Sequence, residues 1–151
     1  MTESNGTCQQ PRGLWVDHHI NVGTYDVDFA GHVNNCYYLR YLEDMRNKLF
    51  DKYFPLKNFV DAGKSPVIAA TNIEYKRPVK LFDQPYGVMW IAKMGNASLT
   101  MQAEIYVGDR LTTKASHVGV FIDLSTGKPI RLPSICTELF KTKDDLVPVR
   151  R

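Results

Sequence analysis

A carboxylate, a glycine, a histidine and two adjacent asparagines lie close together in residues 25–38, which read Tyr-Asp-Val-Asp-Phe-Ala-Gly-His-Val-Asn-Asn-Cys-Tyr-Tyr. Asp28 can act as a base or a nucleophile, and Gly31 allows a backbone turn that a side chain would obstruct. Asn34 or Asn35 can cap the helix that follows, whose first N–H groups lack intrahelical partners and form an anion-stabilising pole. A carboxylate that faces a helix N-terminus is suited to the hydrolysis of an activated acyl group.

The ordered pattern Asp28-x-x-Gly31-His32-Val33-Asn34-Asn35-x-x-Tyr38 resembles the signature of hotdog-fold acyl thioesterases of the 4-hydroxybenzoyl-CoA thioesterase type. Its His-Val-Asn-Asn segment is most similar to bacterial acyl-CoA thioesterases and plant acyl-carrier-protein thioesterases. The plant enzymes have an asparagine two residues after the aspartate, where this chain has Ala30. The full set of polar motif residues of the plant enzymes is therefore not present in this chain. The resemblance in organisation extends over about residues 14–140.

The resemblance implies hydrolysis of an acyl-CoA thioester to a carboxylic acid and CoA, with Asp28 aligned with the catalytic carboxylate. Asp28 would attack the carbonyl or activate water, and the sequence leaves both routes open. The backbone N–H of Asn35 would contribute to an oxyanion hole, and His32 would orient Asp28 or water. Structural roles compete with these. A loop aspartate is commonly a turn former or cap, a role open to Asp26 too, and a histidine beside a turn is commonly structural.

Substrate binding is assigned to Gly31, Asn34, Tyr38 and Arg77 within or after the motif. The phosphates of CoA favour basic partners. The basic candidates are Lys76, Arg77, Lys80, Lys93, Arg110 and Lys114. We expect no organic cofactor and no metal, because thioesters are already activated and the histidines show no ligand spacing.

Apolar side chains recur at spacings of three and four over residues 35–54 and predict one long helix that ends before Pro55. Its apolar stripe consists of Tyr38, Leu42, Met45, Leu49 and Tyr53. Strands are predicted at residues 15–27, 67–79, 86–94, 98–107 and 111–124. Tight turns between the last of them favour an antiparallel meander. The chain is thus predicted to be α+β, with an antiparallel sheet wrapped around one long central helix, which is the hotdog fold.

The same helix carries adjacent carboxylates at Glu43 and Asp44, with Arg40 and Arg46 nearby. Some hotdog branches have a catalytic carboxylate on the helix. The neighbouring arginines favour a solvated ion-pair face instead.

The 151 residues are expected to form a single domain at residues 14–140, with a disordered leader at residues 1–13 and a C-terminal tail at residues 141–151. A net charge of +3 is too small to indicate nucleic-acid binding. No apolar run approaches the length of a membrane span, and three widely spaced cysteines fit a reducing compartment. We therefore expect a cytoplasmic protein that does not bind membranes.

The expected partners are an acyl-CoA or acyl-carrier-protein substrate and further copies of the chain, as a homodimer or homotetramer. A thin sheet around one helix leaves an edge that a second copy would protect, and the resemblance also implies a site between subunits. Two alternatives share the fold: a dehydratase or hydratase, and a non-catalytic acyl-binding module. The His followed by a Pro-Gly turn that is typical of the first is not found in the sequence.

Overall fold

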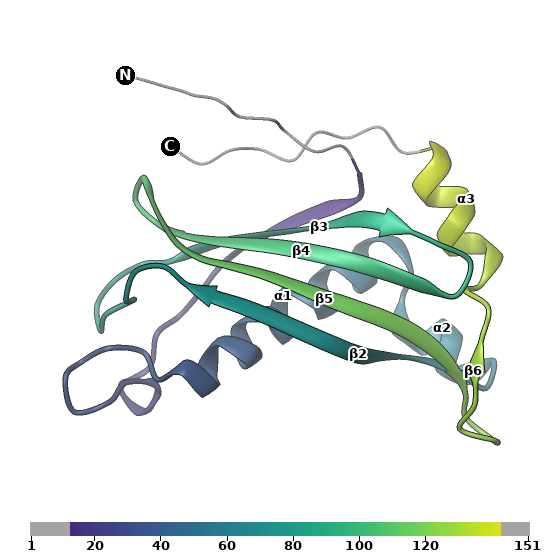
Figure 1. Cartoon of the computed structure of the whole chain (residues 1–151), viewed down its shortest axis with the longest axis horizontal. Helices are drawn as coiled ribbons and strands as arrows, with labels where there is room; N and C mark the ends of the chain where they lie inside the picture. The colour runs from purple at the N-terminus through teal and green to yellow at the C-terminus, as the bar shows by residue number, and fades with distance from the viewer. Residues whose placement is uncertain (1–12, 143–151) are drawn as a thin grey trace.

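The computed structural model describes residues 13–142 (Figure 1). The predicted leader and tail lie outside the described residues, apart from residues 13, 141 and 142. In chain order the elements are β1 (Trp15–His19), the 3₁₀ turns η1 (Thr24–Asp26) and η2 (Asn35–Tyr37), α1 (Tyr38–Tyr53), α2 (Leu56–Asp61), β2 (Lys64–Tyr75), β3 (Tyr86–Met94), β4 (Ser98–Val107), β5 (Arg110–Asp123), β6 (Pro129–Ile130) and α3 (Ser134–Thr142). None of the described helices is both long enough and apolar enough to span a bilayer.

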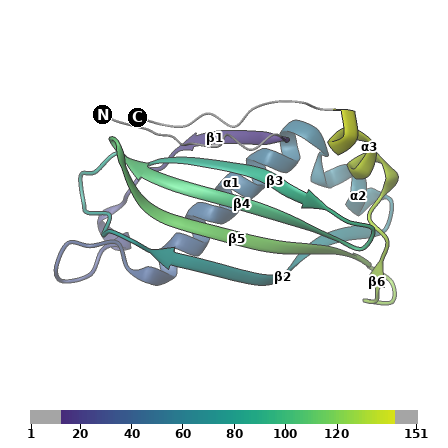
Figure 2. The ribbon, with the colours of Figure 1, turned by 45° about the horizontal axis from the view of Figure 1, so that its top comes forward.

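The sheet has the strand order β1-β3-β4-β5-β2, with β6 paired to β5, and every pairing is antiparallel. Helix α1 runs across one face of this sheet, which curves around it (Figures 1 and 2). The prediction of an α+β hotdog arrangement is confirmed. Strand β2 follows the helices in the chain, pairs with β5, and forms one edge of the described sheet.

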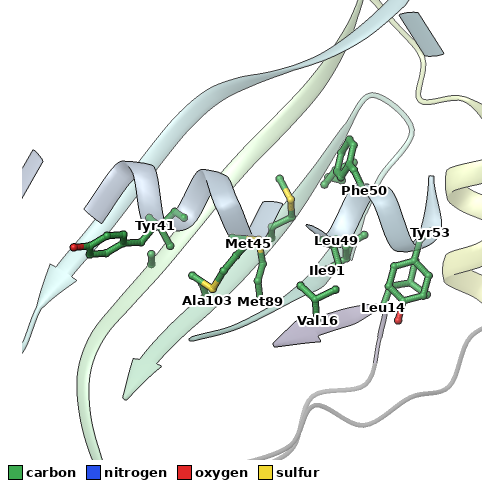
Figure 3. Close-up of a cluster of buried hydrophobic side chains, with 14 of the residues drawn as sticks. Leu14, Val16, Tyr41, Met45, Leu49, Phe50, Tyr53, Met89, Ile91 and Ala103 are labelled. Carbon is green, nitrogen blue, oxygen red and sulfur yellow. The ribbon is translucent and has the colours of Figure 1, made fainter. Parts of the chain in front are cut away.

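The apolar stripe of α1 forms the centre of the core, as predicted. Leu42, Met45 and Leu49 are 0% exposed and belong to one cluster with side chains of β1, β3 and β4 (Figure 3). Burial of each such side chain contributes roughly 1.5–3 kcal/mol. Gly87 of β3 lies under the helix, where a β-carbon would overlap the sulfur of Met45. A glycine at this position therefore lets α1 approach the sheet closely.

The first strand is shorter than predicted, because the chain leaves the sheet before the motif. Strand β1 ends at His19, and Ile20 donates to the Pro85 carbonyl (3.0 Å). The chain then turns at Gly23, whose N–H donates to the Asp26 carboxylate (3.0 Å). Residues 20–27 are thus used to position the motif, not to extend the strand.

Strand β2 covers Lys64–Tyr75, against the prediction of residues 67–79. The N–H groups of Lys76 and Arg77 both donate to the Thr112 carbonyl (2.8 and 3.1 Å), which ends the ladder before Pro78. The helix prediction also began too early, because residues 35–37 form a 3₁₀ turn ahead of α1. The elements α2, β6 and α3 were not predicted.

Candidate active site

The Asp28 carboxylate is held by the backbone of its own loop. Its Oδ1 accepts the N–H groups of Ala30 (2.9 Å) and His32 (3.1 Å). The Asp28 N–H donates to the His32 carbonyl (2.8 Å), and the Gly31 N–H donates to the Asp28 carbonyl (3.0 Å). These four bonds close a tight loop that fixes the carboxyl group through one oxygen. Because Asp28 is exposed, its second oxygen is accessible for chemistry.

Gly31 is needed in this loop for its backbone conformation. Its φ is +78°, and a β-carbon built on it would have no atom within 4 Å. A side chain would therefore fit sterically but would strain the left-handed backbone. The Gly31 carbonyl also accepts the Leu81 N–H (3.0 Å), which ties the motif loop to the loop before β3.

Asp26 anchors the same loop from inside the protein. It is fully buried, and its Oδ2 accepts the Tyr41 hydroxyl (2.8 Å) in addition to the Gly23 N–H. Its carbonyl accepts the Asn34 N–H (2.9 Å). Burial, reinforced by the hydrogen bond to Asp26, raises the pKa of Tyr41, so its hydroxyl stays a donor. Asp26 thus connects both ends of the motif to helix α1.

The start of the helix leaves a backbone donor beside the Asp28 loop. The Asn34 Oδ1 accepts the Cys36 N–H (3.4 Å), and the Asn34 carbonyl accepts the Tyr37 N–H (2.9 Å). The Asn35 N–H has no acceptor among residues 13–142. Asn34 therefore caps the 3₁₀ turn that leads into α1, while the free N–H of Asn35 adds to the positive pole at the start of the helix.

These groups meet at an open cavity of about 390 Å³, which we call the motif cavity. Six of the seven predicted site residues line it: Asp28, His32, Asn34, Asn35, Tyr38 and Arg77. The seventh, Gly31, shapes the loop without lining the cavity. Val33, Tyr75, Lys76 and Pro78 complete the wall. The structure thus brings the motif together with the segment that follows β2.

Two tyrosines form the aromatic part of this wall. Tyr38 is 2% exposed and packs edge-on against Tyr75, with ring centroids 5.0 Å apart. The Tyr75 hydroxyl donates to the Asn35 carbonyl (3.3 Å), so the end of β2 is joined to the start of the helix. Tyr75 was missed in the sequence, because its role depends on strand pairing that brings it beside residues 40 positions earlier.

Positive charge lies on one side of the motif cavity. Of the basic candidates, Lys76 and Arg77 line it, and Lys80, Lys93, Arg110 and Lys114 do not. Lys76 pairs with Glu74 (3.2 Å), whereas Arg77 is exposed and has no ion pair among the described residues. Arg77 is therefore the better placed cation for a phosphate group.

The helix carboxylates lie outside this cavity. Glu43 forms an ion pair with Arg46 (3.7 Å), as predicted, but Arg40 lies over the Tyr25 ring at 5.7 Å. Within the described part of the chain, no group of three or more His, Cys, Asp or Glu side chains is arranged to hold a metal ion.

Comparison with known proteins agrees with this geometry. Residues 22–140 match the thioesterase-like superfamily, and a search of curated proteins gave no match. A DHNA-CoA thioesterase from Staphylococcus aureus has a TM-score of 0.74 at 22% identity, over 78% of this chain and 80% of that chain. A Thermus thermophilus thioesterase complexed with coenzyme A and Zn has a TM-score of 0.73 at 26% identity, over 87% of this chain and 92% of that chain.

The probable thioesterase YbaW from Escherichia coli has a TM-score of 0.69 at 24% identity, over 83% of this chain and 94% of that chain. Such likenesses show that the sheet and helix form a hotdog fold. Because the superfamily match spans the motif, the helix and strands β2 to β6, this chain belongs to the thioesterase-like superfamily.

Proposed function

We propose that the protein hydrolyses acyl-CoA thioesters to a free carboxylic acid and CoA. The observation that carries this proposal is the Asp28 carboxylate, which two backbone N–H groups fix at the motif cavity beside the start of the helix. A fixed, exposed carboxylate beside an unpaired backbone N–H suits attack on an activated carbonyl. The superfamily match and the coenzyme A bound to the Thermus thermophilus protein support the choice of substrate.

In the proposed reaction, Asp28 either removes a proton from water, which attacks the carbonyl carbon, or attacks that carbon itself. The carbonyl oxygen becomes negative and accepts the Asn35 N–H. Collapse of the tetrahedral intermediate breaks the C–S bond, and CoA leaves as a thiolate. In the second route water then hydrolyses the acyl–Asp28 anhydride and releases the acid. A single turnover in ¹⁸O-water that labels the carboxyl group of Asp28 demonstrates the second route, with water attacking the Asp28 carbonyl carbon of the anhydride, because base catalysis places the label only in the released acid.

The other cavity residues have supporting roles in this proposal. Arg77 binds a phosphate of CoA, Tyr38 forms the apolar floor, and Asn34 holds the helix start in place. His32 orients water or Asp28, with its backbone already bonded to Asp28 at both N–H and carbonyl. No metal or organic cofactor enters the mechanism. The free Cys36 and Cys136 fit a reducing compartment, and we propose the cytoplasm.

We further propose that two copies pair along β2 as a homodimer, or as a homotetramer built from such dimers. Ala69, Ala70, Thr71 and Asn72 of this edge strand are exposed and uncharged. Antiparallel pairing around a two-fold axis between Ala69 and Ala70 would bring residues 65–68 of one copy to residues 71–74 of the other. The motif cavity would then be completed by the partner.

The proposal predicts that Asp28→Asn lowers kcat by roughly a hundredfold or more, with KM far less changed. The amide oxygen of asparagine can still accept the two loop N–H groups, so the fold and thermal unfolding should be preserved. The assay follows CoA release with a thiol reagent from short, long and aromatic acyl-CoAs and from an acyl-carrier protein. Near-normal kcat in the variant would exclude Asp28 as the reacting group.

Asp83→Asn is the matched control. Asp83 also accepts a backbone N–H, that of Lys80 (2.8 Å), in the neighbouring loop, but it does not line the motif cavity. Its replacement should leave kcat unchanged. If the wild-type protein binds these substrates but hydrolyses none of them, the protein is an acyl-binding module instead.

A further inference from the structure

A second cavity, of about 400 Å³, lies between α1 and the helix-facing side of β2, β4 and β5. We call it the inner cavity. Most of its wall is apolar and includes Phe50, Leu56, Ile68 and Met101. Its volume lies in the range of small-molecule sites, and an apolar wall suits an acyl chain.

One side of the inner cavity is polar, because Glu43, Arg46 and Asn47 of α1 line it. The Arg46 side chain is only 22% exposed, and its Nη2 lies 3.7 Å from a Glu43 oxygen. Glu43 is 58% exposed, so this ion pair is long and largely solvated. The guanidinium charge at the cavity wall is therefore only weakly compensated.

A buried histidine fixes this arginine. His117 of β5 is 2% exposed, and its Nδ1 lies 3.3 Å from Arg46 Nη1. Burial, together with the charge of Arg46, lowers the pKa of His117 to about 4. The imidazole is consequently neutral near pH 7, and its Nδ1 accepts from the guanidinium. His117 thus positions Arg46 without adding charge.

Arg46 retains unused donors in this arrangement. A guanidinium has five N–H groups, and its two recorded contacts are to His117 and Glu43. A half-buried arginine at an apolar wall loses hydration, which is unfavourable unless an acceptor replaces the water. An oxygen carried into the cavity by a ligand would supply that acceptor.

We propose that the inner cavity binds the acyl group and that Arg46 selects acyl chains ending in a hydrogen-bond acceptor oxygen, a carboxylate above a hydroxyl. The inference rests on the proposed thioesterase function and on the pairing along β2. That pairing would bring the cavity wall at Ser65–Ile68 opposite residues 71–74 of the partner, next to the end of β2 where the partner's motif cavity begins. An acyl chain could then extend from Asp28 of one copy into the inner cavity of the other.

The test measures binding separately from hydrolysis. Three non-hydrolysable thioethers of CoA carry a six-carbon chain: S-hexyl-CoA, its ω-hydroxy analogue and its ω-carboxy analogue. Calorimetry on the wild-type protein should give the tightest binding for the carboxylate, then the hydroxyl, then the methyl end. Arg46→Met should reduce the preference for the carboxylate by about tenfold to a hundredfold while S-hexyl-CoA binds as before.

Arg40→Met is the matched control, because Arg40 lies on the same helix but over Tyr25 and outside the inner cavity. It should leave all three affinities unchanged. Arg46→Lys should restore part of the preference for the carboxylate, since it keeps the charge but loses the fork of donors.

Gly119→Val tests the location of the chain. Gly119 lines the inner cavity, and a β-carbon there would make only ordinary contacts with Met101 (3.7 Å) and Leu99 (3.8 Å). Valine should therefore fold and fill the cavity, so that all three thioethers bind more weakly while CoA itself does not.

Equal affinity of the wild-type protein for the three thioethers would overturn the proposal, as would an unchanged preference in Arg46→Met. If the preference is present but no acyl-CoA is hydrolysed, the proposed thioesterase function fails and the assignment of the inner cavity stands. If acyl-CoA is hydrolysed but the preference is absent, the assignment of the inner cavity fails and the proposed thioesterase function stands.

Discussion

Asp26 and Asp28 are two residues apart and have opposite environments. Asp26 is fully buried against Tyr41, whereas Asp28 is exposed and bonded to its own loop. The first carboxylate can hold the loop because its partners lie on α1, and the second can react because one of its oxygens is not used by the fold. Residue type alone makes the two equivalent, so their division of roles comes from where the chain turns at Gly23.

At the same scale, the buried His117 predicts a pH dependence of stability. Its pKa falls from an ordinary value of 6.5 to about 4, chiefly because of burial, so between these pH values the unfolded chain binds a proton that the folded chain does not. Stability should therefore decrease as pH falls through this window. The full shift corresponds to up to about 3 kcal/mol.

The measurement is the free energy of unfolding in urea from about pH 7 to about pH 4.5, for the wild-type protein and His117→Asn. Asparagine can accept from Arg46 but does not titrate. Its curve should be flatter than that of the wild-type protein, and the difference isolates His117 from the carboxylates common to both proteins. Parallel curves would show that His117 does not cause the dependence.

Among the elements, α1 supplies the largest part of the core, and its stability should depend on the buried stripe more than on its charged side. Leu49 is 0% exposed and packs in the main cluster (Figure 3). Leu49→Ala should lower the free energy of unfolding by about 2–5 kcal/mol through lost burial and a residual cavity. Asp44→Ala, on the exposed side, should change it by less than about 0.5 kcal/mol. Equal effects in urea unfolding would contradict this view of the helix.

Elements with several periods of pattern could be predicted from the sequence, and shorter ones could not. Alternation predicted the bounds of β4 as observed, 98–107, and the turns on either side of residues 86–94 predicted those of β3. Helix α2 has six residues and β6 has two, too few to show a period. Helix α3 has nine residues, and its apolar face, with Cys136 buried and Leu139 and Phe140 half-buried against the core, is short.

The candidate site divides in the same way. The motif residues are neighbours in the chain, so their types and spacing predicted a common loop at the helix start. Tyr75 belongs to the motif cavity through its contact with Asn35, 40 residues earlier. Arg46 is held at the inner cavity by His117, 71 residues later. Those contacts are set by strand register, such as Met101 opposite His117, and register depends on the whole sheet.

For the whole molecule, the edge strand β2 makes assembly a testable consequence of the fold. Its central residues are exposed, and small uncharged side chains leave the backbone open to pairing with a second copy. Ala70 lies next to the proposed two-fold axis, where a charge would face its own copy. Ala70→Glu should therefore separate the copies and abolish most of the hydrolysis, because each motif cavity would lose the wall that the partner supplies.

Light scattering at micromolar concentration, with the activity assay on the same samples, measures both effects. The wild-type protein should have at least twice the mass of one chain. Ile135→Glu is the matched control: Ile135 is 46% exposed on α3, away from β2, so the same charge there should change neither mass nor activity. A fully active wild-type monomer would overturn both the assembly and the shared site. An Ala70→Glu monomer with full activity would overturn the shared site alone, since each motif cavity would then work without its partner.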